Sequence, residues 1–269
     1  MNNLQNRLFK MLCWFHDYCE ENEIRYYAIG GTMLGAARHK GFIPWDDDID
    51  LGVPRKDYNK LIGMFQKPID GYYLESPYSG NRDFLYSFSK LYDINSTLIE
   101  HTRYDCKRGI YIDIFPLDGV GNSKEEAVSN VRQFDRKNML LMMRTCAIRK
   151  ERRWYKNLSI YLARLIPSFM INEKNLAIKL DQLANKMNDE EAVYWANMNG
   201  AYRYKEIVKG ELFGEPTLYE FEGKKINGPQ KYDEYLTEIY GDWRQLPPED
   251  RRKTEHDFVN LDLNNSYMK

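Results

Sequence analysis

Residues 26–53 read YYAIGGTMLGAARHKGFIPWDDDIDLGV and carry the strongest structural signal in the chain. An apolar run leads into a double glycine and a short amphipathic segment, and four aspartates follow within five positions. Asp48 and Asp50 alternate with the apolar residues around them. A strand here would direct both carboxylates to one face and the apolar side chains to the other.

Four carboxylates this close repel one another and raise one another's pKa unless a cation binds. Oxygen ligands suit Mg²⁺, Mn²⁺ or Ca²⁺ rather than zinc. An EF-hand loop starting at Asp46 is one alternative, but Leu51 stands where that loop requires glycine, and Asp57 stands where it requires glutamate. A solvated acidic turn without a ligand is the other, although the neighbouring apolar residues indicate anchoring in a core.

The residues before the aspartates predict a strand, a turn and a helix. Tyr26–Ile29 is a short apolar strand, and Gly30 and Gly31 allow the backbone to approach a ligand closely. Thr32 is expected to be the N-cap of a helix through Met33–Arg38. Free amide groups at such a helix start favour phosphate.

This order of elements is the layout of the nucleotidyltransferase fold. The string GGTMLGAARHKGFIPWDDDIDLGVPRKDY, residues 30–58, further resembles the signature of the LicD family. That family contains phosphocholine and related phosphotransferases that modify cell-surface glycans, and it includes the fukutin-related branch. The resemblance covers residues 26–119 well and residues 230–256 moderately.

Two further positions match the family pattern. Asp113 interrupts the apolar strand GIYIDIFPLDG, residues 109–119, and a buried charge requires a partner or a metal. The resemblance implies that Asp113 is a third carboxylate on the strand beside Asp48 and Asp50. Asp118 is expected to cap the turn after this strand. Lys90, in FSKLYDINSTLIE, either projects into water or binds phosphate near the metal.

The resemblance implies an α/β (α+β) fold whose nucleotidyltransferase-like core is a mixed sheet flanked by helices. One domain would span residues 1–269, with a helical insertion at about 122–190. The implied reaction transfers a phosphocholine-type group from CDP-choline to a sugar hydroxyl of a cell-surface glycan, lipopolysaccharide or teichoic acid precursor and releases CMP. Asp48, Asp50 and Asp113 would be catalytic and would hold Mg²⁺, with Mn²⁺ as an alternative. Asp113 is the expected acceptor of the hydroxyl proton.

The implied substrate-binding residues are Gly30, Gly31, Thr32, Arg38, Lys90 and His256. The glycines and Thr32 would contact phosphate oxygens, and Arg38 or Lys90 would stabilise the CMP leaving group. His256 could face the nucleotide or the acceptor, or simply the solvent. Two other functions stay open: transfer of another phospho-alditol or glycerol phosphate group from its CDP donor, and a catalytically silent choline-binding partner of another LicD protein.

Composition narrows the functional classes. A formal charge of -1 argues against nucleic-acid binding by bulk charge, and 43% hydrophobic residues indicate a folded globule. Four cysteines without metal-ligand spacing predict reduced thiols in the cytosol: Cys13, Cys19, Cys106 and Cys146. No signal peptide is evident, so a cytoplasmic location is expected. The 21 tyrosines are expected mainly in cores, with an aromatic ligand cage as the alternative.

The predicted insertion contains a basic amphipathic stretch. Ser123 and Glu126 predict a capped helix to about Cys146, and Asn172 begins another helix. Residues 144–166 hold seven Arg or Lys and one Glu, a balance of 7 − 1 = +6, interleaved with aromatic and aliphatic residues. This stretch is either a helix packed on the core with a solvated basic face or a peripheral contact with the inner face of the plasma membrane.

Overall fold

The computed structural model describes residues 1–104, 106–254 and 258–268, so His256 lies outside the described residues. Within these ranges the largest sheet has seven strands, in the order β1-β2-β7-β4-β3, with β8 on β7 and β9 on β8. Strands β2 and β7 are parallel, whereas the other pairs are antiparallel. The strands are β1 (Tyr27–Ala28), β2 (Asp50–Pro54), β3 (Tyr72–Glu75), β4 (Ser89–Asp93), β7 (Tyr111–Gly121), β8 (Tyr194–Ala196) and β9 (Ile207–Lys209). The expected mixed sheet is confirmed.

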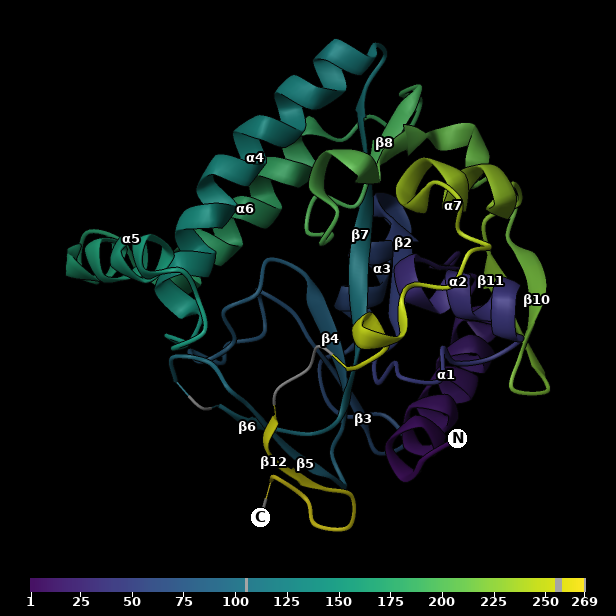
Figure 1. Ribbon diagram of the computed structural model, residues 1–269, viewed down its shortest axis with the longest axis horizontal. Helices are drawn as coiled ribbons and strands as arrows, with labels where there is room; N and C mark the ends of the chain where they lie inside the picture. Colours follow the sequence, from purple (N-terminus) through teal and green to yellow (C-terminus); the bar gives the residue numbers. More distant parts are fainter. Residues whose placement is uncertain (105, 255–257, 269) are drawn as a thin grey trace.

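Helices lie on both sides of this sheet (Figure 1). Those near β1 and β2 are α1 (Asn3–Glu21), α2 (Gly30–His39), α3 (Arg55–Met64) and α7 (Tyr232–Tyr240), and those beyond β7 are α4 (Lys124–Thr145), α5 (Trp154–Leu165) and α6 (Glu173–Met187). The larger hydrophobic cluster joins α1, α2 and α3 to the sheet, and a smaller one joins α4 and α6 to the end of β7. In the described part of the chain, no helix combines the length and apolarity needed to cross a bilayer.

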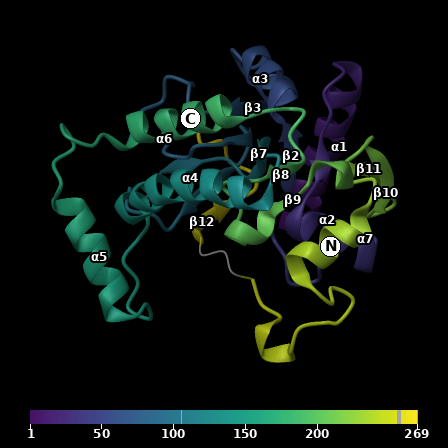
Figure 2. The same cartoon turned by 90° about the horizontal axis from the view of Figure 1, so that it is seen from above.

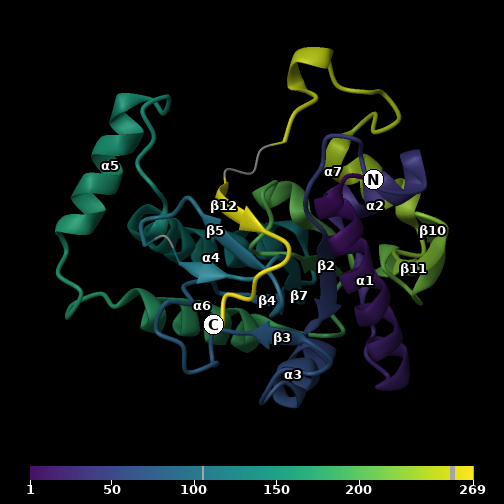
Figure 3. The ribbon, with the colours of Figure 1, turned by 90° about the horizontal axis from the view of Figure 1, so that it is seen from below.

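Two small sheets flank the main one. One is a hairpin formed by β10 (Thr217–Phe221) and β11 (Lys224–Gly228). The other sheet is β12-β5-β6, in which β12 (Phe258–Asp262) pairs with β5 (Thr97–Glu100), and β5 pairs with β6 (Lys107–Arg108) (Figure 3). Three short 3₁₀ helices complete the description: η1 (Arg203–Glu206), η2 (Gly210–Leu212) and η3 (Glu249–Arg251).

Local capping signals predicted the N-caps of α4 and α6 correctly, but they misplaced the N-cap of α2. The Ser123 side chain accepts a hydrogen bond from the Glu126 amide, and Asn172 caps α6 as expected. The prediction that Thr32 is an N-cap is wrong, because α2 already begins at Gly30 and Ile29 occupies the N-cap position. Gly30 has a φ of 53°, a left-handed conformation that glycine adopts without steric cost.

Arg55 joins three elements through a buried ionic network. Its Nε and Nη2 donate to the two carboxylate oxygens of Asp118 at 2.6 and 2.9 Å, and its Nη1 donates to Asp181 Oδ1 at 2.7 Å. The three side chains are at most 2% exposed. Asp118 therefore does not cap a turn, contrary to expectation, because β7 continues past it and its carboxylate binds α3 to the sheet.

We predict that Arg55→Met lowers the free energy of unfolding by about 3–5 kcal/mol, because it leaves two carboxylates buried without their cation. Urea unfolding at neutral pH measures this loss. Arg244→Met is the matched control: its ion pair with Asp233 is largely exposed, so the loss should stay below about 1 kcal/mol. Equal losses in the two variants would contradict the assigned role.

Candidate active site

Strand register places three ionisable side chains in a row across β2, β7 and β4. Asp50 pairs with Asp113 in the parallel ladder, and Asp113 pairs with Lys90 in the antiparallel ladder. Residues directly opposite on neighbouring strands project to the same face of a sheet. Accordingly, Lys90 Nζ lies 3.1 Å from Asp113 Oδ1 and 3.7 Å from Glu100 Oε1. Lys90 is buried in this row, so the reading in which it projects into water is wrong.

Asp48 joins this group from a loop. Strand β2 begins at Asp50, so the expectation that one strand carries both aspartates is wrong. Asp48 is nevertheless near enough that its charge raises the pKa of both Asp50 and Asp113. The structure thus brings together the three carboxylates that the sequence singled out.

Burial and mutual repulsion shift the acidity of this cluster. Burial raises the pKa of Asp50 well above its usual value, and the charges of Asp48 and Asp113 raise it further. Burial also raises the pKa of Asp113 to about 6, although Lys90 opposes the shift. Asp113 Oδ1 is buried with no hydrogen bond, and its contact with Lys90 is an ion pair only. The cluster therefore carries more negative charge than its neighbours balance.

The donor atoms of this cluster suit a hard divalent ion better than their present arrangement does. Among the described residues, no group of three or more His, Cys, Asp or Glu side chains is arranged to hold a metal ion as it stands. The donor chemistry does fit a hard divalent ion, because the donors are carboxylate oxygens and one of them is buried without a hydrogen bond. Asp48, Asp50 and Asp113 are the side chains that would hold such an ion.

The double glycine brings the start of α2 against the carboxylates. A Cβ atom at Gly30 would lie 3.3 Å from Asp50 Oδ2, and one at Gly31 would lie 2.9 Å from Asp46 Oδ2. The Thr32 hydroxyl accepts a hydrogen bond from the Asp50 amide at 2.8 Å, which holds the first residue of β2 in place. A larger residue at Gly31 would displace the Asp46 carboxylate, and one at Gly30 would crowd Asp50 and strain a backbone with a φ of 53°.

Arg38 lies away from this row. It is in the last turn of α2, eight residues after Gly30, or roughly 12 Å along the helix axis. Its Nη1 donates to the Trp243 carbonyl at 3.1 Å, and burial lowers its pKa. The structure therefore groups Gly30, Gly31 and Lys90 with the carboxylates but places Arg38 at the opposite end of the helix.

Sequence reasoning missed the aromatic surroundings of Lys90. Its Nζ lies 3.4 Å from the centroid of the Tyr111 ring and 4.4 Å from that of Tyr86, with Phe88 at 5.8 Å. Glu100 accepts hydrogen bonds from the Tyr111 and Tyr86 hydroxyls at 2.6 and 2.9 Å. The abundance of tyrosine hinted at such a cage, but the contacts join three strands and the Tyr86 loop, so no sequence spacing could reveal them.

A cavity of about 370 Å³ adjoins this cage. Tyr86, Phe88 and Glu100 belong to both, and much of the remaining wall comes from the loop before β4, the β5–β6 region and the segment from the end of α4 to Arg152. Side chains from this second part include Tyr104, Arg108, Asn138, Met142, Arg149 and Arg152. The cavity therefore has an aromatic and acidic end near Lys90 and basic residues elsewhere in its wall.

Glu206 is a second residue that sequence reasoning missed. Burial raises its pKa to about 7, and its charge in turn contributes to the raised pKa of Asp50. Its Oε1 accepts a hydrogen bond from the Tyr202 amide at 3.3 Å. Glu206 is the last residue of η1, far from the acidic stretch in sequence, and no motif marks it.

Comparison with known proteins gives the family of this chain. A family model described as the LicD/FKTN/FKRP nucleotidyltransferase domain matches residues 23–146. The chain is 31% identical over 251 residues to the lipopolysaccharide cholinephosphotransferase LicD of Haemophilus influenzae, which covers 91% of this chain and 92% of that protein. The chain belongs to the LicD family. It is a LicD-type phosphotransferase, as the sequence resemblance implied.

Two further relatives match a smaller share of the chain. The mouse ribitol 5-phosphate transferase FKRP is 29% identical over 132 residues, which is 41% of this chain and 26% of that protein. The yeast mannosyltransferase regulator 4 is 29% identical over 118 residues, which is 42% of this chain and 10% of that protein. The expected relation to the fukutin-related branch is confirmed. The family-matched region contains Asp48, Asp50, Lys90 and Asp113, whereas Glu206 lies outside it.

The raised pKa of Asp50 predicts a pH-dependent stability in metal-free buffer. Because the folded state holds this proton more tightly than the unfolded state, ionisation costs stability as pH rises above the usual carboxyl value of about 4. We therefore expect Asp50→Asn to raise the melting temperature at pH 7 but not at pH 4. Calorimetry of chelator-treated protein measures this, and the exposed Asp17→Asn is the control. An equal rise in melting temperature at both pH values would show that the ionisation of Asp50 is not what lowers stability.

Proposed function

We propose that this LicD protein transfers a phosphocholine group from CDP-choline to a sugar hydroxyl of a cell-surface glycan or of a teichoic acid or lipopolysaccharide precursor, and releases CMP. The row of Asp50, Asp113 and Lys90 on three adjacent strands, inside the family-matched region, carries the proposal. Similarity to a cholinephosphotransferase over nine-tenths of the chain supports choline as the head group.

We assign Mg²⁺, or alternatively Mn²⁺, to Asp48, Asp50 and Asp113. The bound ion would neutralise charge on the transferring phosphoryl group and orient the attacking oxygen. Lys90 supplies a fixed positive charge beside Asp113, and the open backbone at Gly30 and Gly31 lets phosphate oxygens approach the start of α2. These residues bind and orient the diphosphate of the donor.

Asp113 is the residue we assign to accept the hydroxyl proton. Burial raises the pKa of Asp113 to about 6 in the metal-free protein, and a bound divalent ion would lower it, so we base this role on the position of the carboxylate beside the proposed metal. Lys90 at 3.1 Å favours the ionised form before the proton is transferred. The pair is thus suited to general base chemistry on a sugar hydroxyl.

The aromatic end of the cavity is our proposed site for the choline head group. A trimethylammonium ion is attracted by ring faces and by a carboxylate, and Tyr86, Phe88 and Glu100 offer both beside Lys90. Lys90 Nζ already faces the Tyr86 ring at 4.4 Å and pairs with Glu100, so the head group would bind on the cavity side of Tyr86 and Phe88, away from this ammonium. This placement puts the head-group phosphorus, not the nucleotide phosphorus, next to Asp113.

We place the reaction on the cytoplasmic side, at the inner face of the plasma membrane. All four cysteines are free thiols, which supports a reducing compartment.

The main alternative reaction is transfer of ribitol phosphate or another phospho-alditol from its CDP donor. The match to a ribitol 5-phosphate transferase over 41% of the chain favours it as the second candidate.

Replacing Asp50 or Asp113 by asparagine should lower kcat by about a thousandfold or more, because a metal contributes several kcal/mol of transition-state stabilisation. CMP release from CDP-choline with Mg²⁺ and a glycan acceptor measures this. Asp47→Asn is the matched control from the same acidic stretch: its carboxylate accepts a hydrogen bond from Thr254 at 2.6 Å, and activity should stay within about tenfold. Full activity of a correctly folded Asp50→Asn variant would show that Asp50 is not a catalytic metal ligand.

Donor labelled separately on choline and on cytidine tests which phosphorus is attacked. We expect only the choline label to reach the acceptor, and we expect CDP-choline to outcompete CDP-ribitol. Phe88→Leu, which removes one ring face, should raise KM for CDP-choline by roughly 3- to 30-fold and leave KM for CDP-ribitol nearly unchanged. Cytidine label on the acceptor would contradict the proposed attack on the head-group phosphorus. An equal change in both KM values would contradict the proposed choline site.

A further inference from the structure

Helix α5 turns its apolar stripe away from the protein. Trp154 and Leu165 are 75% and 76% exposed, and Phe169 in the following loop is 88% exposed. The other exposed members of the stripe are Leu158, Tyr161 and Leu162, so the spacing from Trp154 is 4, 7, 8 and 11 residues. These positions share one face of a helix. A surface helix usually directs this face to the core.

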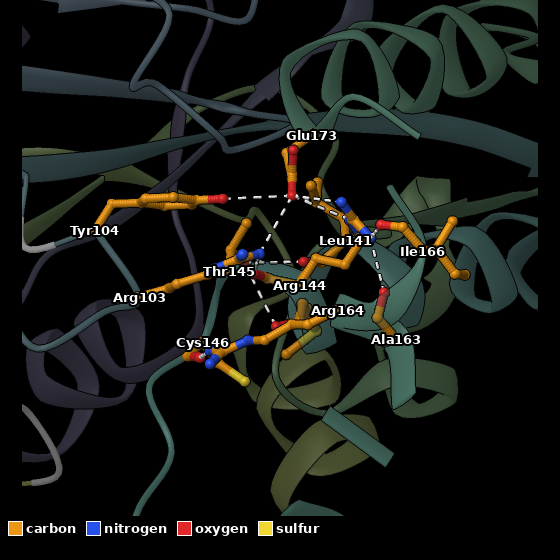
Figure 4. Close-up of polar contacts among 11 residues, drawn as sticks. Arg103, Tyr104, Leu141, Arg144, Thr145, Cys146, Ala163, Arg164, Ile166 and Glu173 are labelled. Carbon is orange, nitrogen blue, oxygen red and sulfur yellow. Dashed lines mark hydrogen bonds and ion pairs between the residues drawn. The ribbon is translucent and has the colours of Figure 1, made fainter. Parts of the chain in front are cut away.

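The outward orientation of α5 is held by a buried ionic clamp (Figure 4). Arg144, which is 1% exposed, donates from Nη1 to the carbonyl oxygens of Ala163 and Ile166 at 2.7 Å each. Its Nε donates to Glu173 Oε1 at 3.0 Å, at the start of α6. Arg164 also donates to the Cys146 carbonyl oxygen. The end of α5 is thereby fixed to α4 and α6, and only its small inner face packs on the protein.

Figures 1, 2 and 3 show α5 standing apart from the sheets and from every helix of the larger core. Ile160 and Ala163 are its only buried residues. The exposed stripe therefore continues into an open surface, formed by α5 and by the loop of residues 166–171, that no other element of the described structure covers. We call this the α5 surface.

Charge around the α5 surface is mainly positive, because exposed Glu151 is outnumbered by the basic residues beside it. Arg149, Lys150, Arg153 and Lys156 are exposed at or just before the start of α5. Residues 152–172 contain no Asp or Glu, although the whole chain has a formal charge of -1. Two of the seven basic residues counted in this stretch, Arg144 and Arg164, are used inside the clamp. The remaining cations lie where they can meet an anionic partner.

We propose that the α5 surface binds an anionic lipid bilayer, with α5 lying in the plane of the interface. A helix of 12 residues is too short to span a bilayer, but exposed Trp, Tyr and Leu beside a basic cluster suit the headgroup region. A second copy of this chain fits less well, because a symmetric contact would bring the two basic clusters together. This proposal goes beyond the transfer reaction and does not depend on it.

Docking in this way brings the cavity beside Lys90 to the lipid surface. Met142, Arg149 and Arg152 line that cavity, and they lie on the segment that leads from α4 into α5. An acceptor carried on a lipid would then enter from the side on which the protein is bound. The α5 surface is thus placed to deliver substrates that stay in the membrane.

Vesicle binding by the full chain tests the proposal. The probes are vesicles of phosphatidylcholine alone and of phosphatidylcholine with phosphatidylglycerol; both contain choline head groups, so head-group recognition cannot explain a difference between them. We expect sedimentation with the anionic vesicles, release by salt, and a blue shift of tryptophan emission that Trp154→Phe abolishes. Leu162→Gln with Leu165→Gln should weaken binding by roughly tenfold or more. Leu218→Gln is the control, since Leu218 is 51% exposed on β10, at the opposite end of the molecule (Figure 1).

Three outcomes would overturn the proposal. One is equal or no binding to the two kinds of vesicle, and another is the same loss in the Leu218 variant as in the double α5 variant. The third is a lipid-free dimer, seen by light scattering, that shifts Trp154 emission and is broken by the α5 changes. Both variants replace exposed side chains, so their melting temperatures should match that of the parent protein and confirm that folding is intact.

Discussion

The parallel pairing of β2 with β7 sets the chemistry of this protein, because its register places two carboxylates side by side in a partly buried site. Asp50 and Asp113 meet there, and Lys90 from β4 is the cation beside them. The neighbouring elements fit this constraint. The double glycine lets α2 approach, and Thr32 fixes the amide of the first residue in β2. The excess negative charge costs stability in the absence of a cation.

Strand β7 carries two buried aspartates with opposite roles. Asp118 accepts two hydrogen bonds from Arg55, which also donates to Asp181, so this arginine binds α3 and α6 to the sheet. Asp113, five residues earlier, keeps one buried oxygen without a hydrogen bond. The Arg55 network makes this end of the strand rigid, and Asp113 is the carboxylate to which we assign the proton transfer. The rigid part of the strand holds the reactive part in position.

A second buried arginine, Arg144, joins α4, α5 and α6 in the same way that Arg55 joins α3 and α6 to the sheet. Arg144 satisfies the last carbonyl groups of α5 and pairs with Glu173, so the helix is held with its apolar face outward (Figure 4). Exposed apolar area of this kind is costly in water and is typical of a binding surface. Its basic surroundings select an anionic partner. The catalytic row and the α5 surface are then linked through the cavity that lies between them.

The residues alone gave the acidic stretch, the third carboxylate, the mixed sheet and the capped helices of the insertion, because these depend on short-range patterns and on a contiguous family signature. Local patterns could not assign Asp118, Lys90 or Glu206, whose surroundings come from elements far apart in the chain. Nor could they show which way α5 faces: periodicity gives an apolar stripe but not its partner. That choice depends on the Arg144 clamp, which forms only when α4, α5 and α6 have packed together.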